Sequence, residues 1–208
     1  MSDITVFSFV EDAPSKEILI RIVEKHNLQS GRRLVFYKGF PSIMGGFGEI
    51  KKKCGAFMNM ALAGQYTLLL TDLDTTDCPM TLIRQWFFSG REDSCRLPHQ
   101  VIFRVAVREV EAWIMADKEG LSEYLGISKT NFVDDPESLS DPKKFLINVL
   151  RQKARTKKIR DTIPKGTAAI GPMYNANLCQ FVRDAWSPEN ACLRAPSLLR
   201  AFNALKRL

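Results

Sequence analysis

The stretch YTLLLTDLDTTD, residues 66–77, decides how the rest of the chain is interpreted. Its first part, Thr67–Thr71, favours β-structure and shows no helical period, which is typical of a strand buried on both faces of a parallel sheet. The run ends in Asp72-Leu73-Asp74. Because ligands of open α/β sheets bind beyond the carboxyl ends of the strands, we expect these carboxylates where chemistry takes place.

The two carboxylates suggest a metal site. Asp72 and Asp74 are two residues apart, so in a continuing strand their side chains point the same way. Two close negative charges repel unless a cation neutralises them, and hard oxygen ligands suit Mg²⁺ or Mn²⁺. The alternative is turn chemistry, since acids are common after strands and Asp77, before Cys78-Pro79, suits a helix N-cap.

The composition is that of a globular protein with one domain, or with one domain and a helical extension. The chain has 208 residues, 45% hydrophobic and 25% charged, which allows a sizeable core. It has no long apolar run, and its N-terminus lacks the order of a signal peptide. Five scattered cysteines and two histidines argue against zinc and against a disulfide framework. We therefore expect a cytoplasmic protein with reduced thiols and no membrane partner.

Positive charge is concentrated late in the chain. The net charge is +7, from 30 basic and 23 acidic residues. Between residues 143 and 165, Asp161 is the only acid among the basic residues Lys143, Lys144, Arg151, Lys153, Arg155, Lys157, Lys158, Arg160 and Lys165. Such a segment suits a protein that holds a polyanion against a metal. A solvated helix face is the alternative interpretation.

Strands and helices alternate over the first half of the chain. The expected strands are Thr5–Val10, Arg33–Tyr37, Thr67–Thr71 and Val101–Val107. The expected helices between them are Lys16–Asn27 with Ser15 as its cap, Glu49–Ala63, and a helix from Cys78 to Phe88. This order predicts an α/β fold with a mostly parallel four-stranded sheet flanked by helices.

The second half of the chain is expected to be helical. The predicted helices are Glu109–Asp117, Leu121–Leu125, Pro142–Lys157, Asn175–Trp186 and Ser197–Leu208, with a connector at Asn131–Pro142 and a loop at Thr162–Pro172. We therefore predict an α/β domain at residues 1–117 and a basic helical C-terminal extension at residues 118–208 packed on it. Trp113 is interpreted as a core anchor, and His26 as a surface residue at a helix end.

Acidic residues follow three of the expected strands. They are Glu11 after the first, Asp72 and Asp74 after the third, and Glu109 and Glu111 after the fourth. A doubly wound sheet brings such strand ends together. Residues two apart in a helix lie about 200° apart, so only one of Glu109 and Glu111 faces the crevice. We favour Glu111 as a further metal ligand or base, with a surface pair of Arg108 and Glu111 as the alternative.

These motifs resemble known families. Glu11 after the first strand with D-x-D after the third resembles the Toprim domain of topoisomerases, primases, recombination factors and OLD-type nucleases, over about residues 4–117. Over nearly the whole chain, GEIKKKCGAFMNMALAGQYTLLLTDLDTTDCP, FRVAVREVEAWIMAD, DPKKFL and GPMYNANL resemble an uncharacterised bacterial family of the DUF4276 type. Asp12 replaces the familiar Toprim glycine, and Ser15 stands where OLD-type nucleases have an aspartate.

The Toprim resemblance implies roles for the acids. Glu11 would act as general acid/base or metal ligand, and Asp72 and Asp74 would hold Mg²⁺. The resemblance also suggests a bacterial setting in genome defence, with an ATPase partner protein.

The resulting hypothesis is a nuclease dependent on Mg²⁺ or Mn²⁺ that acts on DNA or RNA. Its catalytic and metal-binding residues would be Glu11, Asp72, Asp74 and Glu111. Nucleic-acid contacts are expected from Lys51, Lys52, Lys143, Arg155, Lys158 and Lys165, and Tyr174 is a candidate for stacking or hydrogen bonding. One alternative is a non-catalytic Toprim-like module that binds nucleic acid or a partner protein. Another is a nucleotide-binding regulator that uses the Gly45–Gly48 loop.

Overall fold

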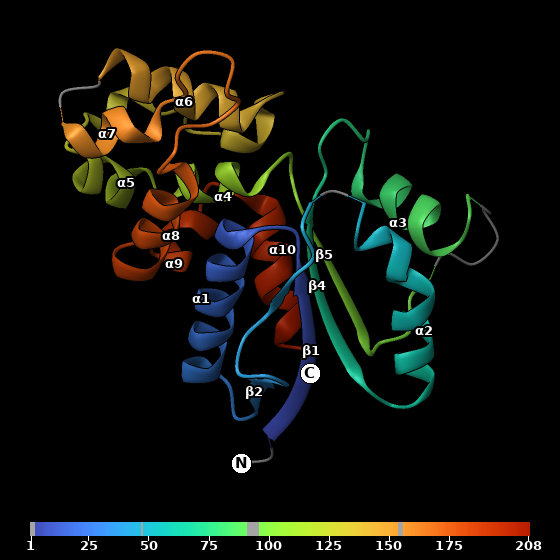
Figure 1. Ribbon diagram of the computed structural model, residues 1–208. Coiled ribbons are helices and arrows are strands. Elements are labelled where there is room, and N and C mark those ends of the chain that lie inside the picture. The colour runs from blue at the N-terminus through green and yellow to red at the C-terminus, as the bar shows by residue number, and fades with distance from the viewer. Residues whose placement is uncertain (1–2, 47, 91–95, 154–155) are drawn as a thin grey trace. The chain divides into compact units, whose positions relative to one another are not determined.

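A computed structural model describes residues 3–46, 48–90, 96–153 and 156–208 (Figure 1). The chain forms two compact units, Met1–Ala106 with Arg200–Leu208, and Val107–Leu199. The first division therefore comes earlier than the predicted boundary at residue 117, and the C-terminal segment belongs to the first unit. The boundary lies before the helix that follows the last strand, Val110–Ala116. All residues of this helix are buried, and it packs on helices of the second unit.

The first unit contains a five-stranded sheet. Its strands are β1 (Asp3–Val10), β2 (Arg33–Phe36), β3 (Ser42–Ile43), β4 (Tyr66–Asp72) and β5 (Val101–Ala106). The order is β2-β1-β4-β5, and β3 pairs with the edge of β1 opposite β4. All four strand pairings are parallel. The α/β fold with a mostly parallel sheet is thus confirmed, whereas the count of four strands is wrong because β3 is too short to show a strand pattern.

Strand β4 lies in the middle of the sheet, as its sequence predicts. Residues 67–72 are all buried, and the strand pairs with β1 on one side and β5 on the other. Helix α1 (Ala13–Gln29) covers one face of the sheet, while α2 (Cys54–Leu62) and α3 (Pro79–Phe87) cover the other (Figure 1). Because helices cover both faces of the sheet, hydrophobic and polar residues do not alternate along this strand.

Helix α1 begins earlier than predicted. Its N-cap is Asp12, not Ser15: one Asp12 carboxylate oxygen accepts hydrogen bonds from the Ser15 N–H at 2.9 Å and from the Ser15 hydroxyl at 2.6 Å. Pro14 falls in the first turn, where its missing N–H has no consequence. The interpretation of His26 as a surface residue is also wrong, because this histidine is buried on the inner side of α1.

Two other helix starts differ from the prediction. The segment expected to be one helix from Glu49 begins as a 3-10 turn, η1 (Lys51–Lys53), before α2. Helix α3 is capped by Cys78 instead of Asp77, because the Cys78 Sγ accepts the Thr81 N–H at 3.4 Å. Both differences are shifts within a turn of the expected element.

The second unit is helical. Its helices are α4 (Val110–Ala116), α5 (Lys118–Leu125), α6 (Pro142–Gln152), α7 (Lys157–Thr162), α8 (Tyr174–Asp184) and α9 (Pro188–Cys192), with 3-10 turns η2 (Lys129–Asn131) and η3 (Pro136–Ser138). The helix predicted over residues 142–157 therefore ends earlier, at Gln152, and a separate helix, α7, begins at Lys157. Helix α10 (Pro196–Leu205) contains the second point of division between the units.

Trp113 is the predicted core anchor of α4. It is fully buried, and its indole Nε1 donates a hydrogen bond to the Ser197 hydroxyl at 2.7 Å. A buried indole needs such a partner for its N–H. None of the described helices combines the length and the apolar character that a bilayer crossing requires.

Candidate carboxylate site

Glu11 joins the ends of two neighbouring strands. Val10 pairs with Leu70 in parallel register, so Glu11 follows β1 beside the last residues of β4. Its Oε1 accepts hydrogen bonds from the Thr71 hydroxyl and, at 3.3 Å, from the Asp72 backbone N–H. The side chain is 7% exposed. The structure therefore brings Glu11 to the D-x-D segment.

The environment of Glu11 favours its protonated form. Burial raises the pKa of its carboxyl from 4.5 to about 7; the hydrogen bonds from Thr71 and Asp72 oppose this rise, while the charges of Asp74 and Asp12 add to it. In the described part of the chain, no lysine or arginine forms an ion pair with Glu11. A carboxyl group with a pKa near neutrality can both give and take a proton at physiological pH.

Asp72 and Asp74 occupy different backbone environments. Asp72 is the last residue of β4 and is 8% exposed. The next residue still follows the sheet, because the Leu73 N–H donates to the Ala106 carbonyl oxygen at 2.9 Å. Asp74 is half-buried with a φ of +48°, a left-handed conformation that aspartate tolerates better than most residues. The strand therefore does not continue through Asp74, which was the condition for Asp72 and Asp74 to point the same way, although the Asp74 charge still acts on Glu11.

The glycine-rich loop positions the end of β1. The N–H groups of Gly45 and Gly46 each donate to the Glu11 carbonyl oxygen at 3.1 Å. These glycines have φ values of +91° and +122°, which side chains rarely permit. Two of the N–H groups that a phosphate would need are therefore already bonded, which weakens the nucleotide-binding alternative for this loop.

The lysines after this loop are open to solvent. Lys51 and Lys52 lie in η1 with exposed side chains, and Lys52 Nζ lies 2.5 Å from a Glu49 carboxylate oxygen. They belong to the same unit as the carboxylate site. Their contact with a nucleic-acid backbone stays a prediction.

The donor set fits one particular kind of metal site. Among the described residues, no three His, Cys, Asp or Glu side chains are grouped so as to hold a metal ion. Protein-bound Mg²⁺ usually keeps several waters and is held by one or two carboxylates together with substrate phosphates. Asp72 and Asp74 would supply the carboxylates of such a site, and Mn²⁺ accepts the same oxygen ligands. A closed cage made only of protein ligands does not fit.

Glu111 lies in the second unit and has its own cation. It is 1% exposed, and its Oε1 accepts a hydrogen bond from the Tyr174 hydroxyl at 3.0 Å and lies 3.5 Å from Lys143 Nζ. Glu109 accepts the Lys143 backbone N–H at 2.8 Å and lies 3.5 Å from the same Nζ. Lys143 thus bridges both glutamates. Because Glu111 is buried, it does not form the alternative surface pair, and Tyr174 is a core residue and not an exposed stacking surface.

The other predicted basic contacts are only partly described. Lys143, Lys144 and Arg151 line a pocket of about 400 Å³ in the second unit, together with Glu109 and Asp141. Lys165 is exposed. Arg155 and the side chain of Lys158 lie outside the described residues. The predicted nucleic-acid contacts in this segment therefore stay predictions.

Comparisons with protein-family models, with curated proteins and with solved structures find no match. The Toprim and DUF4276 resemblances therefore depend on the sequence motifs alone. Sequence reasoning missed the hydroxyl of Thr71 and the cap at Asp12. A threonine within the buried strand, directly before D-x-D, was the available signal for the first of these.

Proposed function

We propose that the protein is a nuclease of Toprim type that hydrolyses phosphodiester bonds with Mg²⁺ or Mn²⁺. The observation that carries this proposal is the buried Glu11, with its pKa raised to about 7, hydrogen-bonded to the end of the strand that carries Asp72. Burying an acid without a neighbouring cation destabilises a fold, so a function is the simplest reason to keep it.

Each residue of the site has a separate task. Asp72 and Asp74 would hold the metal ion, which when bound would supply Lewis-acid stabilisation of charge on the phosphodiester oxygens. Glu11 takes a proton from the attacking water or gives one to the leaving oxygen. Thr71 fixes the Glu11 carboxylate through its hydroxyl. Lys51 and Lys52, which are exposed in the same unit, would neutralise phosphates of the nucleic-acid backbone.

The wider setting is proposed from the resemblance alone. The protein would act in the cytoplasm of a bacterium, in genome defence, with an ATPase as its partner protein. The basic residues Lys143 and Lys165, and Arg155 and Lys158, would contribute further contacts to the nucleic acid.

A cleavage assay tests the enzymatic proposal. Plasmid, single-stranded DNA and tRNA are incubated with the protein in Mg²⁺, in Mn²⁺ and in EDTA, beside Asp72→Asn and Glu11→Gln. We expect metal-dependent cleavage that falls by about 100-fold or more in both variants. Asp77→Asn is the matched control, because Asp77 is an exposed acid of the same segment. Cleavage that persists in EDTA, or an equal loss in the control, would contradict the proposal.

The second candidate function is a non-catalytic module that binds nucleic acid or a protein. The lack of a three-ligand metal group among the residues that the structure describes favours it. Metal-independent binding without cleavage, unchanged in Asp72→Asn and Glu11→Gln, would support this candidate over the enzyme.

A further inference from the structure

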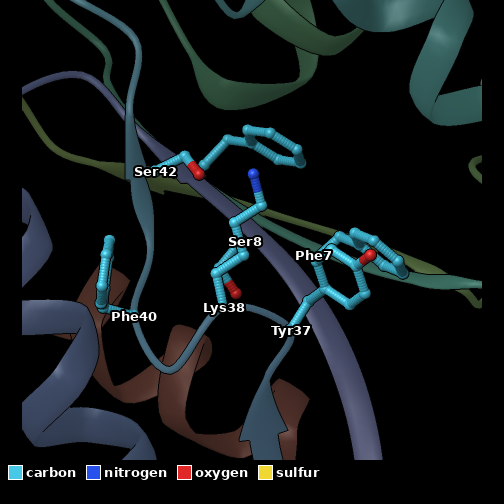
Figure 2. A pocket seen from close by; sticks show the side chains of 7 residues that line it. Phe7, Ser8, Tyr37, Lys38, Phe40 and Ser42 are labelled. Atoms are coloured by element: carbon cyan, nitrogen blue, oxygen red, sulfur yellow. The ribbon is translucent and has the colours of Figure 1, made fainter.

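The first unit has a pocket at the edge of its sheet. Strand β2 pairs with β1 as far as Val6 and Phe36, and β3 resumes the pairing at Phe9 and Ser42. Between these pairings the connecting loop leaves β1 and encloses a pocket of about 210 Å³ (Figure 2). Pockets for whole small-molecule ligands usually measure about 300–1,000 Å³, so this one suits a single ring system.

Exposed aromatic rings border the pocket. Phe7 and Tyr37 are stacked, with ring centroids 4.3 Å apart and an interplanar angle of 27°. Tyr37 is 58% exposed and Phe40 is 52% exposed. Figure 2 shows the stacked pair on one side of the pocket and Phe40 on the other. Open aromatic faces are surfaces on which nucleic-acid bases stack, whatever their sequence.

Ser8 also lines the pocket, and the alternation of side chains along β1 turns its hydroxyl away from the face that carries Phe7 and Phe9. The residue is 5% exposed, and its hydroxyl has no hydrogen-bond partner among the described residues. An oxygen buried this deeply is closed to a ligand in the pocket, so Ser8 shapes the wall of the pocket and is not assigned a contact with a base.

Two lysines lie next to the aromatic rings of the pocket. Lys38 is exposed and lines the pocket, and its side chain lies between Phe40 and the stacked pair in Figure 2. The Lys16 Nζ lies 4.2 Å from the centroid of the Phe40 ring. Aromatic faces with neighbouring ammonium groups suit a ligand that joins a base to a phosphate.

The pocket and the carboxylate site share one strand. Side chains alternate along β1, so Phe7, Phe9 and Glu11 lie on the same face of the sheet. At about 3.3 Å per residue, Phe7 and Glu11 are about 13 Å apart along the strand. A nucleic-acid strand with one base in the pocket can therefore reach the carboxylate site with its backbone.

We propose that this pocket holds one unpaired base, so that single-stranded DNA or RNA is the substrate of the protein. That the bound strand is a substrate rests on the proposed nuclease function. Binding of a base in the pocket does not require cleavage. An intact duplex does not offer such a base, because each base is stacked and paired inside the helix.

Binding without cleavage tests the pocket. Fluorescence anisotropy in EDTA compares short labelled single strands, of DNA and of RNA, with the same sequences as duplexes. We expect tighter binding of single strands, and a loss of about tenfold in their affinity for Tyr37→Ala, as for one lost stacking contact. Ser8→Ala removes a buried hydroxyl that a base does not reach, so it should bind single strands like the wild type.

Matched variants separate stacking from general effects. Tyr37→Phe keeps the ring and should bind like the wild type, and Lys129→Ala removes an exposed lysine of the second unit and should change little. Unchanged single-strand affinity in Tyr37→Ala, equal affinity for duplexes, or no binding of nucleic acid at all would overturn the inference.

The outcomes distinguish this inference from the nuclease proposal. Single-strand binding that depends on Tyr37, without cleavage in Mg²⁺ or Mn²⁺, would support the base pocket and remove the nuclease. Cleavage that depends on Asp72, with an unchanged KM for single strands in Tyr37→Ala, would remove the base pocket and leave the nuclease.

Discussion

Two buried glutamates of this chain differ in what neutralises them. Glu11 in the first unit accepts hydrogen bonds from Thr71 and Asp72 and has no ion pair with a lysine or arginine among the described residues. Glu111 in the second unit lies 3.5 Å from Lys143 Nζ and accepts a hydrogen bond from Tyr174. Both follow strands and both have the same predicted role.

The partner of each carboxyl group indicates its role: we assign Glu11 to chemistry and Glu111 to packing. A buried carboxylate beside a lysine stays charged and is held in place. A buried carboxyl beside other acids has a raised pKa and gains from a metal ion or a proton. Position after a strand is therefore a weaker guide to function than the charge of the nearest partner.

The largest expected effect is on cleavage. Glu11→Gln should slow metal-dependent cleavage by about 10²- to 10⁴-fold, because it removes a general acid/base. Glu111→Gln should leave the rate near that of the wild type, because we assign Glu111 to packing in the second unit. Single-turnover rates at saturating metal measure both. Equal losses in the two variants would show that the charge of the nearest partner does not identify the functional acid.

The next effect is on stability. Lys143→Met removes the ammonium group 3.5 Å from the buried Glu111. Because the Lys143 side chain is 34% exposed, we expect the free energy of unfolding to fall by about 1–2 kcal/mol, less than for a fully buried pair. Urea denaturation measures the change, and Lys144→Met, an exposed neighbour, is the control. The double variant Lys143→Met with Glu111→Gln should recover part of the loss. A single variant as stable as the wild type would mean that Lys143 is not the required cation.

The pH dependence of stability should reveal the raised pKa of Glu11. Burial raises the pKa of Glu11 from 4.5 to about 7, so the folded state keeps its proton at a pH where the unfolded chain has lost it. Stability contributed by Glu11 is thus full below pH 4.5 and is lost as the pH rises to about 7. Glu11→Gln has no such proton and should be more stable than the wild type at pH 8, by about 2–3 kcal/mol.

Thermal unfolding of the wild type and Glu11→Gln between pH 4 and pH 8 measures this difference. The two curves should diverge as the pH rises. Parallel curves would show that Glu11 is not perturbed, and the contrast with Glu111 would then fail.

The sequence allowed the sheet and one part of the site to be predicted. The apolar run before Asp72 identified the central strand. Because the carboxyl ends of parallel strands lie at one edge of a sheet, Glu11 was expected beside the end of that strand. These predictions needed only local pattern and topology. The cation of Glu111 was not predictable in this way, because Lys143 and Tyr174 are 32 and 63 residues away along the chain.

The N-cap of α1 was also predicted incorrectly, because two nearby residues can both cap a helix. Asp12 and Ser15 are both good N-cap residues. In the structure Asp12 is the N-cap, and Ser15 donates a hydrogen bond to it. Strand β3 has only two residues, too few for any alternation to be visible. Tertiary pairing with β1 decides that strand, not its own sequence.

The smallest expected effect concerns Asp12, which belongs both to the cap and to the charge around Glu11. Asp12→Ala removes the cap of α1 and should lower the free energy of unfolding by about 1 kcal/mol. Asp12→Asn keeps a capping oxygen but removes a charge that raises the pKa of Glu11, so it should retain stability and shift the Glu11 titration downward. Urea denaturation and the pH profile of cleavage measure the two effects separately. An unshifted profile in Asp12→Asn would mean that burial and Asp74 alone raise the pKa of Glu11, and that Asp12 serves only the helix.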